Sequence, residues 1–303
     1  MGLSEATLRD LNGLIPGVEP AVGTALLLPE TEQLQAKKAR VLSVTGSGRI
    51  TSSAGEEIPL ACGAWMDPGT TICTSVESFA TIRLAEDEDG SVYDDVRVSS
   101  STCVTIVTST VTADGRNSLL NISEGSISVS ASEADNGVVT VQTPTSLTTG
   151  TQGDFRVTIE EDAARTEALE EAVVSVFAEG VEVELTEQQG TRAESGEAPI
   201  SPVTLLDTGF LIRPDNDAVL VWPDFTWTPV DRALGYRVQI SSSPDFARIL
   251  HQEDVPYPEW RPDFLLLPVD VSSLWWRVTS FDRLGFESPP SNPRRLQVPG
   301  KEE

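Results

Sequence analysis

The chain has 303 residues and a formal net charge of -26 at pH 7, with 47 acidic side chains against 21 lysines and arginines. Lysine occurs only at Lys37, Lys38 and Lys301, so no basic stripe is available to neutralise the phosphates of a nucleic acid. These numbers argue against a nucleic-acid partner, and the same charge disfavours an anionic membrane surface. The length allows two domains and a small third piece.

No stretch approaches the roughly 18 consecutive apolar residues of a membrane helix, so we expect no membrane span in this chain. The first 30 residues also lack the basic and apolar regions of a secretory signal. The sequence is compatible with a cytoplasmic chain or with a trimmed product, and the incomplete motif described next favours trimming.

The N-terminal segment is predicted to begin with a short helix. Ser4 is a plausible N-cap, Leu8 and Leu11 are three residues apart, and Asn12-Gly13 ends the pattern before an apolar run at 25–28. Residues 1–30 resemble the second half of a LysM module, which would place a small helical remnant here. The resemblance implies contact of Asn12, Gly13 and Leu14 with peptidoglycan glycan. The first half of the module is missing, and a docked terminal cap is the alternative.

After a polar connector at 31–40, residues 41–185 consist of short alternating apolar runs that end at glycine-containing turns. This pattern predicts an all-β domain. Residues 161–172 are the exception, because their Ala, Leu and Glu content favours a short helical excursion.

An ordered series of motifs runs through this all-β region. Its members are Leu60-x-x-Gly63, Pro68-Gly69 before Ile72-x-Thr74, Asp89-Gly90-Ser91, Leu119 to Val129 around Glu124-Gly125, Thr149-Gly150-Thr151 and Glu179-Gly180-Val181. The series resembles the FecR domain family, which implies short strands in a two-sheet or solenoid-like arrangement and an extracytoplasmic location (periplasm or cell surface). The family usually carries arginine where this chain has Thr149.

Residues 186–202 are polar and contain Gly and Pro, which predicts a linker. Residues 203–299 then resemble a fibronectin type III-like β-sandwich. The motifs are Phe225-x-Trp227, the run from Tyr236 to Ser241, and the run from Trp275 to Val278. Strand phase places Trp227 and Trp276 in the core. It leaves Trp222, Trp260 and Trp275 as candidates for an exposed contact surface.

Two other groups of residues are candidate sites. Cys62, Cys73 and Cys103 permit one disulfide without selecting the pair, and buried free thiols are the alternative. Asp87, Asp89 and Asp94 offer oxygen ligands that suit Ca²⁺, although a solvated Asp-Gly hairpin turn explains the same residues. We expect no cofactor.

No pattern brings together a nucleophile, a base and an orienting group, so we expect no enzyme. The sequence favours a non-enzymatic binding and scaffolding protein of the bacterial cell envelope, associated with peptidoglycan or mediating protein-protein contacts. Its partners would be other envelope proteins or further copies of itself. One alternative is a structural subunit of a surface assembly or filament. The other is the periplasmic partner-sensing module of a FecR-type signalling system.

Overall fold

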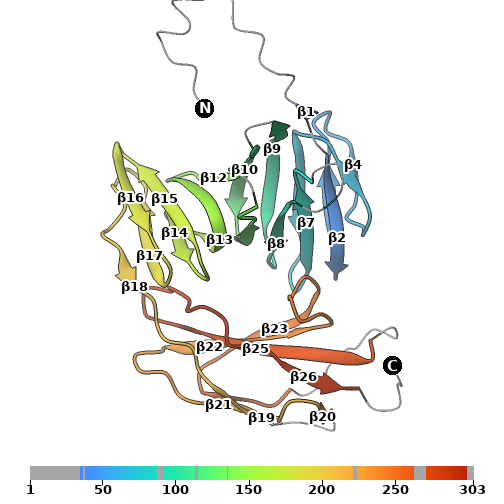
Figure 1. Cartoon of the computed structure of the whole chain (residues 1–303), viewed down its shortest axis with the longest axis vertical. Coiled ribbons are helices and arrows are strands. Elements are labelled where there is room, and N and C mark those ends of the chain that lie inside the picture. Colours follow the sequence, from blue (N-terminus) through green and yellow to red (C-terminus); the bar gives the residue numbers. More distant parts are fainter. Residues whose placement is uncertain are drawn as a thin grey trace, which may run out of the picture. The chain divides into compact units, whose positions relative to one another are not determined.

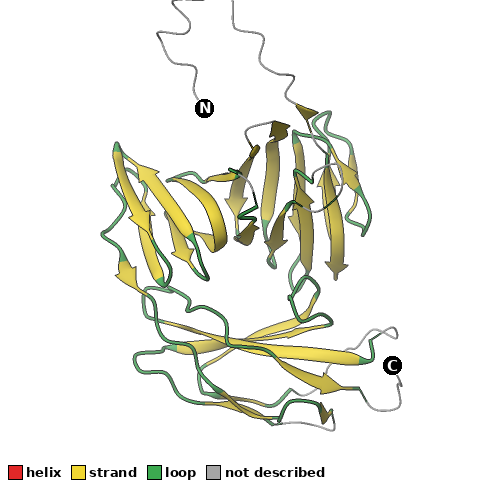
Figure 2. Cartoon of the chain, viewed as in Figure 1, coloured by secondary structure: helices red, strands yellow, loops and turns green. Residues whose placement is uncertain are grey.

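The structure, a computed structural model, describes residues 35–36, 38–86, 90, 92–112, 115–134, 136–220, 224–262 and 271–298. These residues form strands and loops, which confirms the all-β fold class (Figure 2). None of them belongs to a helix long and apolar enough to cross a membrane. The expected N-terminal helix falls outside the described residues. The chain from Ala36 onward forms one compact unit.

Strands β1 (Gln35–Ala36) to β18 make up what we call the first β-unit (Figure 1). Its strands hydrogen-bond into two ladders that share β13 (Leu147–Glu160). Ladder A contains, in order, β4 (Glu57–Pro59), β3 (Gly48–Thr51), β6 (Thr70–Thr74), β9 (Cys103–Thr112), β10 (Gly115–Glu124), β12 (Val138–Gln142), β13, β15 (Val173–Ala178) and β16 (Val181–Leu185). Ladder B contains β5 (Trp65–Met66), β2 (Ala39–Thr45), β7 (Phe79–Leu84), β8 (Asp94–Val98), β11 (Ser126–Ala131), β13, β14 (Ala163–Ala168), β17 (Gln189–Glu194) and β18 (Val203–Thr204).

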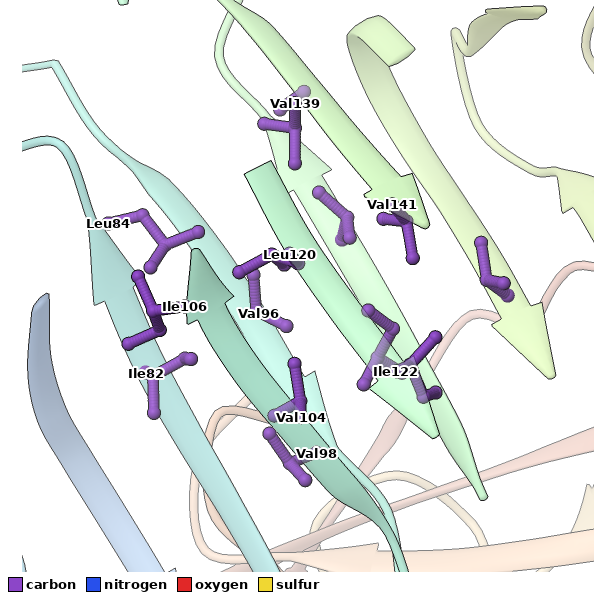
Figure 3. Packing of buried hydrophobic residues seen from close by; sticks show 14 of the residues in the cluster. Ile82, Leu84, Val96, Val98, Val104, Ile106, Leu120, Ile122, Val139 and Val141 are labelled. Atoms are coloured by element: carbon purple, nitrogen blue, oxygen red, sulfur yellow. The ribbon is translucent and has the colours of Figure 1, made fainter. Parts of the chain in front are cut away.

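The inner faces of both ladders meet in one apolar core. Alternate residues of each strand point inward, as in β11, where Ile127 and Val129 are fully buried between partly exposed serines. Figure 3 shows part of this core, with labelled side chains from β7, β8, β9, β10 and β12. Each such aliphatic side chain contributes roughly 1.5–3 kcal/mol through burial.

The expected helical excursion at 161–172 is wrong. Ala163–Ala168 form β14, in which all six residues are buried and which pairs with β13 on one side and β17 on the other. Pairing on both edges and complete burial outweigh a helix propensity that amounts to tenths of a kcal/mol per residue.

The expected linker at 186–202 also differs from the structure. It contains β17, which pairs along its whole length with β14, and β18 then pairs with β17. The first β-unit thus extends to Thr204. The segment looked like a linker because its apolar content is low, yet Ala193 and Thr191 are completely buried in the ladder.

The remaining strands form a two-sheet sandwich, called here the C-terminal sandwich. One sheet contains β19 (Leu211–Arg213), β21 (Phe225–Trp227) and β24 (Glu259–Trp260); the other contains β20 (Ala218–Val219), β26 (Arg294–Gln297), β25 (Ser273–Phe281), β22 (Gly235–Ser241) and β23 (Ile249–Val255). Its core is a separate apolar cluster.

The tryptophans of the sandwich test the strand-phase argument. Trp227 and Trp276 are buried, as predicted, and the ring of Trp276 meets that of Phe225 edge-on at 4.9 Å. Trp260, which we expected on an exposed surface, is also buried, because β24 pairs with β21 and turns this ring against Phe225. Trp275 is partly exposed, and Trp222 lies outside the described residues.

Candidate functional site: an arginine-rich seam

Polar side chains line the outer face of ladder B in a single cross-strand row. The antiparallel registers place Thr81 opposite Arg97, Arg97 opposite Ser128, Ser128 opposite Arg156, and Arg156 opposite Glu167. Period two puts these residues outward while their neighbours fill the core.

The five-stranded sheet of the C-terminal sandwich carries a second polar face. Arg237 lies opposite Thr279, and Gln239 lies opposite both Arg277 and Gln252. The two faces are in contact: the Thr81 hydroxyl donates a 2.6 Å hydrogen bond to the Ala247 carbonyl, and the Ser43 hydroxyl donates to the same oxygen. We call the group Arg97, Arg156, Arg237, Arg277 and Glu287 the arginine seam.

Glu287 is the acidic centre of the seam. Its Oε2 lies 2.9 Å from Arg156 Nη1, and its Oε1 accepts from Arg237 Nη1. Arg237 also donates two hydrogen bonds to Asp254, at 2.7 and 2.9 Å. Burial alone would raise the pKa of Glu287, but Arg156 and Arg237 outweigh it and hold the pKa below its ordinary value. Glu287 is thus ionised in the folded protein at neutral pH.

A second carboxyl group beside the seam behaves in the opposite way. Glu167 is completely buried and accepts a 3.0 Å hydrogen bond from Arg165 Nε, and the Glu287 backbone N–H approaches its Oε1 at 3.4 Å. Burial raises the pKa of Glu167 despite the opposing charges of Arg165 and Arg156. Arg165 in addition contacts Glu160 and donates to the Leu284 carbonyl at 3.3 Å.

A small apolar cluster of Leu169, Leu205 and Phe286 joins the first β-unit to the sandwich next to these charges. The combination of shared ion pairs, backbone contacts and apolar packing fixes the two polar faces against each other. The seam offers charge and hydrogen-bond donors.

The candidate calcium ligands do not form a site among the described residues. Asp94 is completely buried, where it accepts a 3.0 Å hydrogen bond from Arg116 Nη2 and another from the Ser132 backbone N–H at 3.1 Å. Asp94 therefore belongs to a buried ion pair of the core, and a cation ligand role is wrong for it. Asp87 and Asp89 lie outside the described residues, as do Asn12, Gly13 and Leu14. In the described part of the chain no three His, Cys, Asp or Glu side chains cluster as metal ligands do.

The cysteine pair is resolved by the strand register. Cys73 of β6 lies directly opposite Cys103 of β9, and the two form a disulfide. Cys62 is exposed and its thiol donates to the Leu42 carbonyl at 3.0 Å.

Sequence reasoning missed the arginine seam. Arg97, Arg156, Arg237 and Arg277 each occupy a strand centre at an outward position, which is unusual for a chain so poor in basic residues. The outward position of these arginines was the sequence feature that could have indicated the seam. Nothing in the local sequence links Glu287 to them, because its partners come from distant strands.

No protein-family model matches the chain, and no curated protein matches it in sequence. Solved structures with a similar backbone include two crystal structures of a "putative anti-sigma factor" from Parabacteroides distasonis ATCC 8503. They share 15% and 14% sequence identity, with a TM-score of 0.36 over 45% of this chain. A β-1,2-glucanase from Parabacteroides distasonis is 13% identical over 87% of this chain and 37% of its own length, with a TM-score of 0.23. The chain spans 59% of the length of the anti-sigma factor structures.

Proposed function

We propose that the chain is a non-enzymatic binding and scaffolding protein of the bacterial cell envelope that mediates protein-protein contacts. The observation that carries the proposal is an exposed apolar pair on β13 and β15 of ladder A. Leu147 and Phe177 lie directly opposite each other on β13 and β15, with 37% and 46% of each residue exposed, and Val173 on the same face is 49% exposed. Exposed aromatic and aliphatic side chains on a β-sheet are typical anchor residues of a protein interface.

The surroundings of this pair indicate the chemistry of the partner. Glu182 stands opposite Phe177 on β16 and Glu184 stands opposite Ser175. No lysine or arginine occurs between Arg165 and Arg192. An apolar centre with an acidic rim fits a protein surface with an apolar centre and a basic rim, because complementary charges steer association and fix orientation.

Photocrosslinking in cells tests this proposal. A benzophenone amino acid at position 177 should form a discrete protein adduct, whereas the same probe at Val76, which is 76% exposed on the first β-unit, should not. Phe177→Ala should weaken binding of the crosslinked partner about tenfold or more, which corresponds to the loss of one interface anchor. No adduct, or the same adducts at both positions, would remove the proposal.

The disulfide supports the location outside the cytoplasm. Disulfides persist in oxidising compartments and are rare in cytosolic proteins, and Cys73 and Cys103 are adjacent on paired strands. Oxidation state in a fractionated cell measures this directly. A protein recovered only in the cytoplasm with both thiols free would contradict it.

Partner sensing in a FecR-type signalling system is the second candidate function. The described members of the motif series that resembles the FecR family fall within the first β-unit, which has one core, and this favours a single folded module over scattered matches. A sigma-factor gene beside this one, and a two-hybrid signal between the neighbouring regulator and this chain, are the expected results. Absence of both counts against signalling.

Peptidoglycan association and a role as a structural subunit can each be tested by a simple assay. Peptidoglycan association through the LysM-like segment predicts retention on purified sacculi that is lost in an Asn12→Ala and Leu14→Ala double variant. A structural subunit of a surface assembly predicts self-association through the edge of β16, and a monomer at high concentration in analytical ultracentrifugation would exclude it.

A further inference from the structure

A cavity of about 30 Å³ lies inside the arginine seam. The residues that line it include Arg97, Arg156, Arg237, Arg277, Thr279 and Glu287. A polar cavity of this size accommodates an occupant comparable to one water molecule.

The charges around the cavity are unevenly matched. Glu287 is already shared by Arg156 and Arg237, and Arg97 lies 3.3 Å from Asp154. Arg277 differs from the other three arginines of the seam. Within the described part of the chain, no carboxylate oxygen comes within 4.0 Å of its guanidinium.

The contacts that Arg277 makes with the described residues are to neutral groups. Its Nε donates to the Gln239 Oε1 at 2.8 Å, and its guanidinium lies 3.9 Å from the ring centre of Phe246. Burial, followed by the positive charges of Arg97 and Arg156, lowers the pKa of Arg277 well below its ordinary value, and Asp154 and Asp245 offset this only in part. A guanidinium nevertheless keeps its proton at neutral pH. The positive charge at this point is thus undercompensated by the protein.

Thr279 provides an independent observation. Thr279 is 4% exposed and lines the cavity, and its buried hydroxyl has no hydrogen-bond partner among the described residues. Buried polar groups nearly always have a partner, and an unpaired one is most often completed by a water or an ion. Arg277 and Thr279 are two residues apart on β25, so both side chains lie on the same face of the strand.

We propose that this cavity binds one small monovalent anion, chloride, through the guanidinium of Arg277 and the hydroxyl of Thr279. The remaining arginines of the seam supply a favourable field, and the cavity's volume sets the size limit. Chloride would then act as a structural counterion that holds the polar faces of the first β-unit and the C-terminal sandwich together.

Thermal unfolding at constant ionic strength measures the effect in solution. Replacing sodium gluconate by sodium chloride should raise the melting temperature of the full chain by on the order of a few degrees, because a ligand of the folded state stabilises by mass action. Arg277→Gln should abolish this rise. Arg232→Gln is the matched control, since Arg232 is largely exposed beside Asp231, and it should keep the full rise.

A crystal grown in sodium bromide gives a readout that needs no variant. The expected result is an anomalous peak inside the cavity, within hydrogen-bond distance of Arg277 and Thr279. No peak in the cavity overturns the proposal, and so does a chloride response that Arg277→Gln retains in full. If Arg277→Gln fails to fold, Thr279→Val takes its place. A full chloride response in Thr279→Val would likewise overturn the proposal.

Discussion

Arg156 of β13 and Glu287, which follows β25, form a buried ion pair with 2.9 Å between Nη1 and Oε2. Glu287 is at the same time bonded to Arg237 of β22. One carboxylate therefore pairs with an arginine on each side and connects the first β-unit to the C-terminal sandwich. Removing Glu287 from this buried arrangement would leave Arg156 without its carboxylate, while Arg237 would keep Asp254.

Glu287→Gln should lower the free energy of unfolding by about 3 kcal/mol, because it leaves the buried Arg156 without its counter-charge and Arg237 with Asp254 alone. Chemical denaturation measures this change. Asp224→Asn is the matched control: it removes one partner of the exposed Arg261 pair and should have little effect on stability. Equal effects of both substitutions would show that the seam does not couple the units.

Glu167 predicts a pH dependence of stability with a definite sign. Because burial raises its folded-state pKa, the stability contributed by its neutral form is complete below the unfolded-state pKa and is lost as pH rises through the folded value. We therefore compare the free energy of unfolding of Glu167→Gln with that of the original chain. The difference, variant minus original, should increase as pH rises from the acidic range towards neutrality. Parallel curves in denaturation experiments at several pH values would contradict the raised pKa.

The contribution of Glu287 to stability should depend on pH in the opposite direction, which provides a comparison. Its folded-state pKa is lowered, so its contribution is present above the unfolded-state pKa and is lost as pH falls through the folded value. The cost of Glu287→Gln should accordingly shrink at acidic pH. A cost that stays constant to strongly acidic pH would exclude an ionised Glu287 as the cause.

Phe286 anchors the small apolar cluster with Leu169 and Leu205, and it is 1% exposed. Gly190 lies against it, since a Cβ there would come within 2.8 Å of the ring. Phe286→Ala should destabilise the protein by about 3–5 kcal/mol through lost burial and the cavity left behind. Leu284→Ala, at a largely exposed neighbour, should change stability little, and a similar loss for both would refute a packing role for Phe286.

The disulfide joins residues with a sequence separation of 30. Opening a loop of that size should lower the free energy of unfolding by about 3–4 kcal/mol in the chain-entropy account. Denaturation of the Cys73→Ser and Cys103→Ser double variant measures the loss. Cys62→Ser, at the exposed thiol, should leave stability unchanged, and thiol titration of the folded chain should detect one reactive group.

Strand alternation was sufficient to predict much of the fold. Val96 and Val98, Ile127 and Val129, and the pair Trp227 and Trp276 are buried where period two places them. Residues 163–168 were mispredicted because their local preference for helix is weak beside pairing on both edges. Trp260 was mispredicted because a two-residue strand carries no readable period.

The seam could not be predicted in the same way. Its arginines come from separate strands of the first β-unit and the C-terminal sandwich, and only the packing of one polar sheet face on another brings Glu287 to Arg156. Such long-range electrostatic pairs leave no spacing in the sequence. Asp94 shows the converse, since an acidic loop pattern that suits a cation belongs in part to a buried ion pair with Arg116.

The central claim is that the seam holds the two β-units as one rigid scaffold. Pulsed electron paramagnetic resonance measures this directly, with spin labels at Val76 and Tyr257, both largely exposed, in a Cys62→Ser background. We predict a single narrow distance distribution that broadens in Glu287→Gln. A broad distribution in the otherwise unchanged chain would contradict the account.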